Sequence, residues 1–154
     1  MNRSFYTDTI QSFIHTDSGL IIGHLARNSQ FSIQSEQISA WETEIQILKK
    51  NFSDMTGKIY FEYSIPRMGR RIDVLLIIKS AILILEFKAG EKKFKQSAVD
   101  QVWDYALDLK NFHEESHDKF IIPILIATDA EKLDSSEKFI FLGILQFENL
   151  KFML

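Results

Sequence analysis

The chain has 154 residues, 45% of them hydrophobic and 25% charged, a length that suits one compact domain, which we expect to span residues 1–154. It contains no cysteine, which excludes disulfides, thiolate zinc sites and cysteine nucleophiles. The net charge of -3 differs from the basic balance of most dedicated nucleic-acid-binding proteins.

The N-terminal part of the sequence gives few structural signals. Residues 4–13 have weak helical character, and Ser18 with Gly19 predicts a turn. Residues 1–19 lack the basic region and apolar run of an export signal, and the later apolar runs are interrupted by charged residues well before about 18 positions. We therefore expect a soluble, cytoplasmic protein that does not associate with a membrane.

A helix with a clear pattern is predicted from Ser39 to Lys50. Ser39 is placed to cap its N-terminus, and lysines close its C-terminal end, where they favour the helix dipole. Its apolar residues recur at helical spacing, namely Trp41, Ile45 and Leu48. At about 100° per residue, Glu44 falls within this apolar sector, whereas Glu42 points away from it. An acid that faces the core needs a partner or a ligand.

Three strands are predicted after this helix. They cover residues 58–63, 71–78 and 81–87, with a turn over residues 66–69 and a polar break at residues 79–80. The first two strands suggest a hairpin. The nearly continuous apolarity of the third indicates that it is buried on both faces.

A long helix and two further strands complete the predicted order. Residues 96–112 fit one helix, with Ala98, Val102, Ala106 and Leu109 on its core side. Residues 121–127 have the pattern of a buried central strand reached by a crossover connection, and residues 139–147 predict a last strand. The expected fold is therefore α/β, with a mixed central sheet flanked by helices.

Two carboxylates interrupt the apolar strands. Asp73 is the one acid of residues 71–78, and burying it would be costly unless it is paired or binds a metal. Glu86 repeats this anomaly on the next strand, where alternation places Glu86 and Lys88 on one face and Phe87 on the other. Adjacent strands can bring Asp73, Glu86 and Lys88 together.

This grouping suits the hydrolysis of phosphodiester bonds. Two carboxylates can hold Mg²⁺ or Mn²⁺, which polarises a phosphate and lowers the pKa of bound water. Lys88 can orient that water or stabilise the charge that develops on the phosphate. The alternative is a structural ion pair in a buried sheet, in which Glu86 and Lys88 satisfy Asp73 and its neighbours.

The later helix carries further polar residues beside its apolar stripe. Gln101, Tyr105 and Asp108 lie at i, i+4 and i+7, so they can face the edge of the same site. An amide and a phenol there can position water, metal ligands or phosphate. Taken singly, Gln101 and Tyr105 are also ordinary boundary residues of a helix.

Three segments resemble the successive motifs of the PD-(D/E)xK nuclease superfamily, in its RecB-like branch with a QxxxY helix. They are Ile-Asp-Val-Leu-Leu at residues 72–76, Glu86-Phe87-Lys88, and Gln101-Val-Trp-Asp-Tyr105. The resemblance implies a restriction-endonuclease-like α-β-β-β-α-β core. It also implies that Glu44, Asp73 and Glu86 bind Mg²⁺ or Mn²⁺ together with the carbonyl of Phe87, and that Asp73, Glu86, Lys88, Gln101 and Tyr105 are catalytic. Ile72 stands at the position of the nominal proline.

Longer stretches, residues 61–73, 86–90 and 100–113, resemble the N-terminal nuclease-like region of prokaryotic Schlafen-type helicase proteins. This implies a nucleic-acid substrate, DNA before RNA, a helicase or ATPase partner, and a role in defence or nucleic-acid processing. The sequence has no GxxxxGK[ST] motif, so we expect a fragment, a truncated reading frame or a stand-alone relative. A homodimer is a further expectation, because cutting both strands of a duplex takes two sites.

Two other functions fit parts of the sequence. His113 to His117 matches HExxH, the zinc motif of metalloproteases, but no later histidine supplies a third imidazole. The second is a catalytically silent module that binds nucleic acid or docks onto a partner. Two basic groups, Arg67 with Arg70 and Arg71 and Lys92 with Lys93 and Lys95, either contact phosphates or are ordinary solvated charge on loops.

Overall fold

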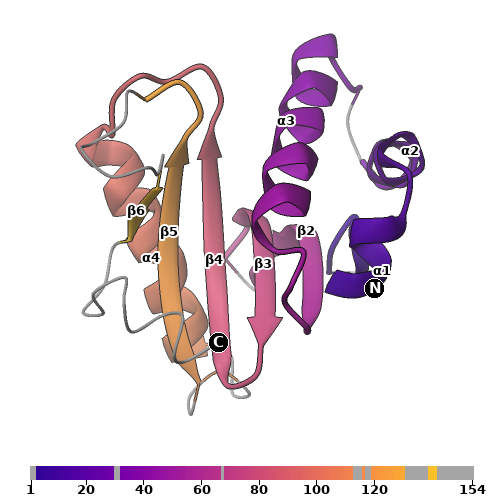
Figure 1. The fold of residues 1–154 in the computed structure, drawn as a ribbon. Helices are drawn as coiled ribbons and strands as arrows, with labels where there is room; N and C mark the ends of the chain where they lie inside the picture. The colour runs from indigo at the N-terminus through magenta and orange to yellow at the C-terminus, as the bar shows by residue number, and fades with distance from the viewer. Residues whose placement is uncertain are drawn as a thin grey trace.

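The computed structural model describes residues 3–29, 32–66, 68–112, 116, 119–130 and 139–141. In these ranges the chain forms a mixed α/β structure with helices on both faces of one sheet (Figure 1). The strands are β1 (Tyr6–Thr9), β2 (Lys58–Ser64), β3 (Arg71–Ile78), β4 (Ala81–Lys88), β5 (Phe120–Ala127) and β6 (Phe139–Phe141). The helices are α1 (Ile10–His15), α2 (Ser18–Asn28), α3 (Ser35–Asn51) and α4 (Gln96–Phe112).

The order of the strands across the sheet follows their order along the chain, from β1 to β6. Neighbouring strands are antiparallel except for β4 and β5, which are parallel and connected through α4. This confirms the predicted crossover connection. The C-terminal ends of β4 and β5 therefore lie side by side at the end of the sheet where α4 begins.

Each face of the sheet has its own hydrophobic core. Helices α1, α2 and α3 cover one face, where fully buried side chains such as Phe13, Trp41 and Phe61 meet. Helix α4 covers the other face with Ala98, Val102, Ala106 and Leu109, as its apolar stripe predicts. Residues 81–87 of β4 are buried throughout, because alternate residues of this strand contribute to the two cores.

The boundaries of the central elements agree closely with the sequence patterns. The bounds of β3 and α4 are those predicted, and β2, β4 and β5 each differ by one residue at one end. The last strand is described over Phe139–Phe141 only, so the rest of that prediction lies outside the described residues. The HExxH histidines and Arg67 also lie outside them.

The N-terminal predictions were wrong in three places. Residues 4–13 contain the edge strand β1 as well as the short helix α1. The predicted turn at Ser18 is the first turn of α2, whose N-terminus is capped by the Asp17 carboxylate through the N–H groups of Gly19 and Leu20. Helix α3 begins at Ser35, so Ser39 is not its N-cap.

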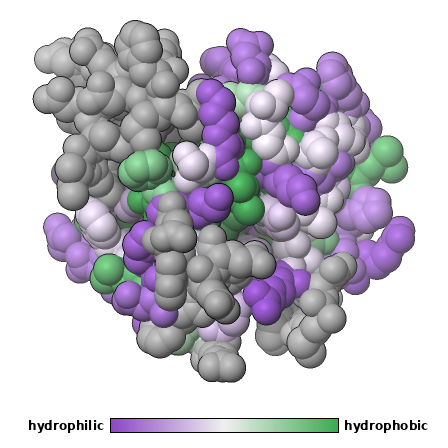
Figure 2. Space-filling view, turned by 90° about the horizontal axis from the view of Figure 1, so that it is seen from below, coloured by the Kyte–Doolittle hydropathy of each residue, from purple (hydrophilic) through white to green (hydrophobic). Residues whose placement is uncertain are grey.

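Hydrophilic side chains cover most of the coloured surface in Figure 2, with hydrophobic ones between them. None of the helices in the described ranges combines the length and the apolarity that a membrane crossing requires.

Candidate active site

Strands β3 and β4 separate at the point where the predicted acids lie. Their described register ends at the pair Val74 and Leu85. One residue further, the Asp73 carboxylate accepts a hydrogen bond of 2.8 Å from the backbone N–H of Phe87. A side chain of β3 therefore takes the place of a backbone partner for β4. This contact holds Asp73 next to Glu86.

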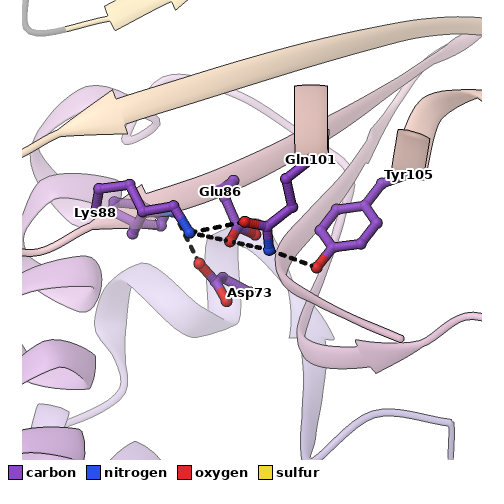
Figure 3. Close-up of polar contacts among 6 residues, drawn as sticks. Asp73, Glu86, Lys88, Gln101 and Tyr105 are labelled. Atoms are coloured by element: carbon purple, nitrogen blue, oxygen red, sulfur yellow. Dashed lines mark hydrogen bonds and ion pairs between the residues drawn. The ribbon is translucent and has the colours of Figure 1, made fainter. Parts of the chain in front are cut away.

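Four side chains from β4 and α4 form a continuous hydrogen-bonded network (Figure 3). The Nζ atom of Lys88 donates to Oε1 of Glu86 at 2.8 Å and to Oε1 of Gln101 at 3.0 Å. The Nε2 atom of Gln101 donates to Oε1 of Glu86 at 2.8 Å and to the phenol oxygen of Tyr105 at 2.7 Å. The structure thus brings Asp73, Glu86, Lys88, Gln101 and Tyr105 into one site.

Glu44 lies on α3, which covers the other face of the sheet. Its side chain is buried, with 6% of the residue exposed, whereas Glu42 on the same helix is exposed, as the helical projection predicts. Burial raises the pKa of Glu44 well above its ordinary value, and repulsion from Asp73 and other nearby acids raises it further. Glu44 therefore belongs to the electrostatic environment of Asp73.

The other two acids are also poorly stabilised as anions. Burial and repulsion from Glu86 raise the pKa of Asp73 well above its ordinary value, although the Phe87 N–H partly opposes this. Burial raises the pKa of Glu86, and its hydrogen bond with Lys88 offsets part of that rise. A site that collects carboxylates in this way favours a cation among them.

Lys88 supplies a positive charge to this cluster. Burial favours its neutral form, but the hydrogen bond and charge of Glu86 outweigh that effect and raise the pKa of Lys88 above its ordinary value. Lys88 is therefore a cation at neutral pH, held between Glu86 and Gln101.

Two carboxylate oxygens of the site fit the requirements of a metal ligand. Oε2 of Glu44 and Oε2 of Glu86 are buried and have no hydrogen-bond partner in the described part of the chain. Leaving such atoms unsatisfied is costly, and hard oxygen donors are the ligands that Mg²⁺ and Mn²⁺ prefer. Among the described residues, however, no three acidic, histidine or cysteine side chains are already arranged around one point as a metal cluster. The donor chemistry fits a divalent cation, and closing the donors around it requires side chains to move.

The backbone of Phe87 also faces this cluster. Its N–H points to Asp73, and in an extended strand the C=O of a residue lies on the same edge as its N–H. The Phe87 carbonyl therefore points to the Asp73 side of β4. Its side chain packs into the core beneath α3, opposite Glu86 and Lys88, as strand alternation predicts.

Glu62 is a fourth acid near the cluster, and sequence reasoning missed it. It lies on β2 opposite Asp73, between the register pairs that Phe61 and Tyr63 form, and it contributes to the raised pKa of Glu44, Asp73 and Glu86. Its carboxylate accepts a hydrogen bond of 2.9 Å from Nε1 of Trp41 and lies 3.5 Å from Nε of Arg71.

The conformation of Glu62 sets it apart. Its φ of 52° is in the left-handed region, which costs a non-glycine residue about 1–3 kcal/mol. Glu62 occupies a polar position of an alternating strand, so its residue type gave no anomaly in the sequence. The sequence could have indicated Glu62 through the predicted hairpin, because pairing residues 58–63 with residues 71–78 places Glu62 opposite Asp73.

The first basic group has acidic partners inside the protein. Arg70 lies 3.3 Å from Asp104 and 3.6 Å from Asp108, and Arg71 pairs with Glu62. Asp108 therefore faces the β2–β3 connection. These ion pairs partly neutralise Arg70 and Arg71 and so weaken their attraction for a phosphate.

Comparison with known proteins adds no relative. No protein-family model, no curated protein and no solved structure matches this chain. The geometry and chemistry of the acids, the lysine and the α4 amide are therefore the basis for assigning a function.

Proposed function

We propose that this protein is a divalent-metal-dependent nuclease that hydrolyses phosphodiester bonds, in DNA before RNA. The observation that carries the proposal is that the half-buried Asp73 and the buried Glu86 lie together with the cation Lys88 where β3 and β4 separate, with the buried Glu44 in their electrostatic environment. A structural ion pair would account for Glu86 and Lys88. It would leave the burial of Glu44 and the unpaired Oε2 atoms of Glu44 and Glu86 unexplained.

The residues have distinct roles in this proposal. Asp73, Glu86, Glu44 and the Phe87 carbonyl would hold Mg²⁺ or Mn²⁺, which polarises the phosphate and lowers the pKa of bound water. Lys88 stabilises the negative charge that develops on the phosphate. Gln101 fixes the position of Lys88 and Glu86 and connects them to the Tyr105 phenol.

The order of elements supports a restriction-endonuclease-like core within the mixed α/β structure. From α3 through β2, β3, β4 and α4 to β5, the chain runs α-β-β-β-α-β, the order that the resemblance to PD-(D/E)xK nucleases implies. The candidate residues lie on α3, β3, β4 and α4 of this series, which supports the proposal. Elements β1, α1, α2 and β6 would be additions to that core.

A specific observation favours a second candidate, a catalytically silent module that binds nucleic acid or a helicase partner. Lys88 and Gln101 both donate to Oε1 of Glu86, so protein side chains satisfy this oxygen of the acid. A homodimer or an ATPase partner would belong to either candidate. The two candidates differ in whether a divalent cation displaces this pairing.

The deciding experiment is a cleavage assay on labelled single-stranded DNA, duplex DNA and RNA, with Mg²⁺, Mn²⁺ or EDTA. Asp73→Asn and Lys88→Ala should abolish metal-dependent cleavage, whereas Glu42→Gln, on the exposed side of α3, should leave it unchanged. If wild type and the variants bind nucleic acid but none of them cleaves it in Mg²⁺, Mn²⁺ or EDTA, the result would favour the silent module.

A further inference from the structure

A cavity of about 250 Å³ adjoins the candidate active site on the α4 side of the sheet. Lys88 and Gln101 belong to both, so the cavity opens beside the atoms that bond Glu86. Its other polar lining residues are Glu91, Lys93, Lys95 and Ser97. The cavity is therefore a continuation of the active site with a different chemical character.

The lining of this cavity is basic. Among the described residues that line it, three are lysines and one, Glu91, is an acid, which pairs with Lys95 at 2.5 Å. Lys88 is held by Glu86 and Gln101, while Lys93 is exposed to solvent at the rim. A cavity with more lysines than acids attracts an anionic group.

The position of the cavity in the fold adds to this preference. It lies at the C-terminal ends of the parallel strands β4 and β5, where crevices of open α/β sheets bind ligands. The first turn of α4, which includes the cavity residue Ser97, contains no acidic residue. The partial positive charge of the helix N-terminus is thus not compensated within its own first turn.

The first part of the segment that carries these lysines, from Lys88 to Glu91, is tied to the end of β5. The backbone N–H of Gly90 donates to Oγ1 of Thr128 at 2.8 Å, and the N–H of Thr128 donates to the Lys88 carbonyl at 3.2 Å. The N–H of Asp129 donates to the Glu91 carbonyl at 3.2 Å. These contacts fix the backbone from Lys88 to Glu91 against the end of β5, at one side of the cavity.

We propose that this cavity binds a phosphate of the substrate strand other than the phosphate that is cleaved. The inference rests on the proposed function for the identity of the ligand, because the active site it adjoins is assigned to phosphodiester chemistry. Lys93, Lys95 and the start of α4 hold this phosphate, and Lys88 lies between it and the metal-binding acids. The phosphate is either an internal one or the terminal phosphate of a strand end.

The test separates binding from cleavage. Fluorescence anisotropy in EDTA measures the affinity of the full chain for a labelled single-stranded oligonucleotide over a range of salt concentrations. The double variant Lys93→Ala/Lys95→Ala is compared with Lys50→Ala/Lys58→Ala, which removes the same charge from exposed positions at the end of α3 and the start of β2. Circular dichroism confirms that both variants are folded.

The cavity variant should bind about 5- to 25-fold more weakly at 0.1 M salt, because each lost contact with a single strand changes the salt slope by about 0.7. The control variant should keep the wild-type slope. Equal affinity and slope in the cavity variant and wild type would overturn the inference even if the protein cleaves nucleic acid. Weakened binding without any cleavage in wild type would overturn the nuclease proposal alone.

Oligonucleotides with a terminal phosphate or a terminal hydroxyl distinguish the two sources of the phosphate. A terminal-phosphate site gives wild type a preference for the phosphorylated end, at either the 5′ or the 3′ terminus, that disappears in Lys93→Ala/Lys95→Ala. An internal-phosphate site gives equal binding to both ends and a uniform loss in the variant. A preference that persists unchanged in the variant would place the anion elsewhere and contradict the inference.

Discussion

Lys88 and Glu86 lie two residues apart on β4 and share a 2.8 Å hydrogen bond, although only 3% of Glu86 is exposed to solvent. The contact joins a buried anion to a cation that remains partly accessible. This hydrogen bond offsets part of the cost of burying the Glu86 carboxylate next to Asp73.

Removing the lysine should therefore destabilise the fold. Lys88→Met leaves Glu86 with Gln101 as its remaining side-chain donor, and we expect a loss of about 1–3 kcal/mol in the free energy of unfolding. Adding Glu86→Gln should recover most of it, because the buried charge disappears. Urea denaturation of both single variants and the double variant measures this coupling, and additive losses would show that the contact does not stabilise the protein.

The buried Glu44 should make stability depend on pH. Its pKa is raised, so the unfolded chain releases this proton near the ordinary value of 4.5 while the folded protein retains it. The folded state therefore binds more protons above this pH, and stability falls as the pH rises from 4.5 towards the folded pKa. Glu44→Gln should lose less stability than wild type between pH 4.5 and neutrality. Glu42→Gln should follow wild type, and identical curves for all three proteins would refute the prediction.

Divalent cations should stabilise the protein through the same acids. At ten times its Kd, a bound cation adds about 1.4 kcal/mol to the free energy of unfolding. Mg²⁺ or Mn²⁺ should raise the Tm of wild type, and Asp73→Asn should cancel the effect. Differential scanning fluorimetry measures it, with Asp17→Asn at the start of α2 as the control acid. Equal shifts in the two variants would indicate a non-specific ion effect.

Gln101 should act by positioning its neighbours. Gln101→Ala removes the amide that joins Lys88, Glu86 and Tyr105, and we expect single-turnover cleavage to slow by about 10- to 100-fold with little change in Tm. Gln96→Ala, at the exposed start of the same helix, is the matched control. A loss of nucleic-acid affinity as large as the loss of rate would point to a binding role instead.

Glu62, the fourth acid near the site, should contribute to the affinity for a divalent cation. Glu62→Gln keeps an acceptor for Nε1 of Trp41 but removes a charge that repels the other acids. We expect higher stability at neutral pH without metal and weaker binding of Mn²⁺, measured by isothermal titration calorimetry. Unchanged metal affinity would show that Glu62 is a structural partner of Trp41 and Arg71 alone.

The sequence allowed the central part of the fold to be predicted because its signals are strong and local. Helix α4 has a complete apolar stripe, and β3 and β4 are apolar runs in which a single acid stands out. The grouping of Asp73, Glu86 and Lys88 followed from strand alternation together with the adjacency of the two strands. Glu44 was found because a helical projection shows which of two nearby acids faces inward.

What the sequence left undetermined depends on tertiary contacts. Strand β1 has only four residues, with two of them partly buried, and it is a strand because it pairs with the edge of β2. The start of α3 has no capping side chain, so the sequence contains no residue type that marks where this helix begins. The left-handed φ of Glu62 is imposed by the surrounding structure and has no counterpart in residue type.

The strand order of the sheet also bears on how the protein folds. Strand β2 pairs with β3, and β3 with β4, across short connections, and such local pairings form at a small entropic cost. One stretch of the chain contains Asp73, Glu86, Lys88, Gln101 and Tyr105. It ends within α4, the helix that connects β4 to the parallel strand β5. The pairing of β3 with β4 brings Asp73 and Glu86 together within this stretch, whereas Glu44 comes from α3, which precedes it in the chain.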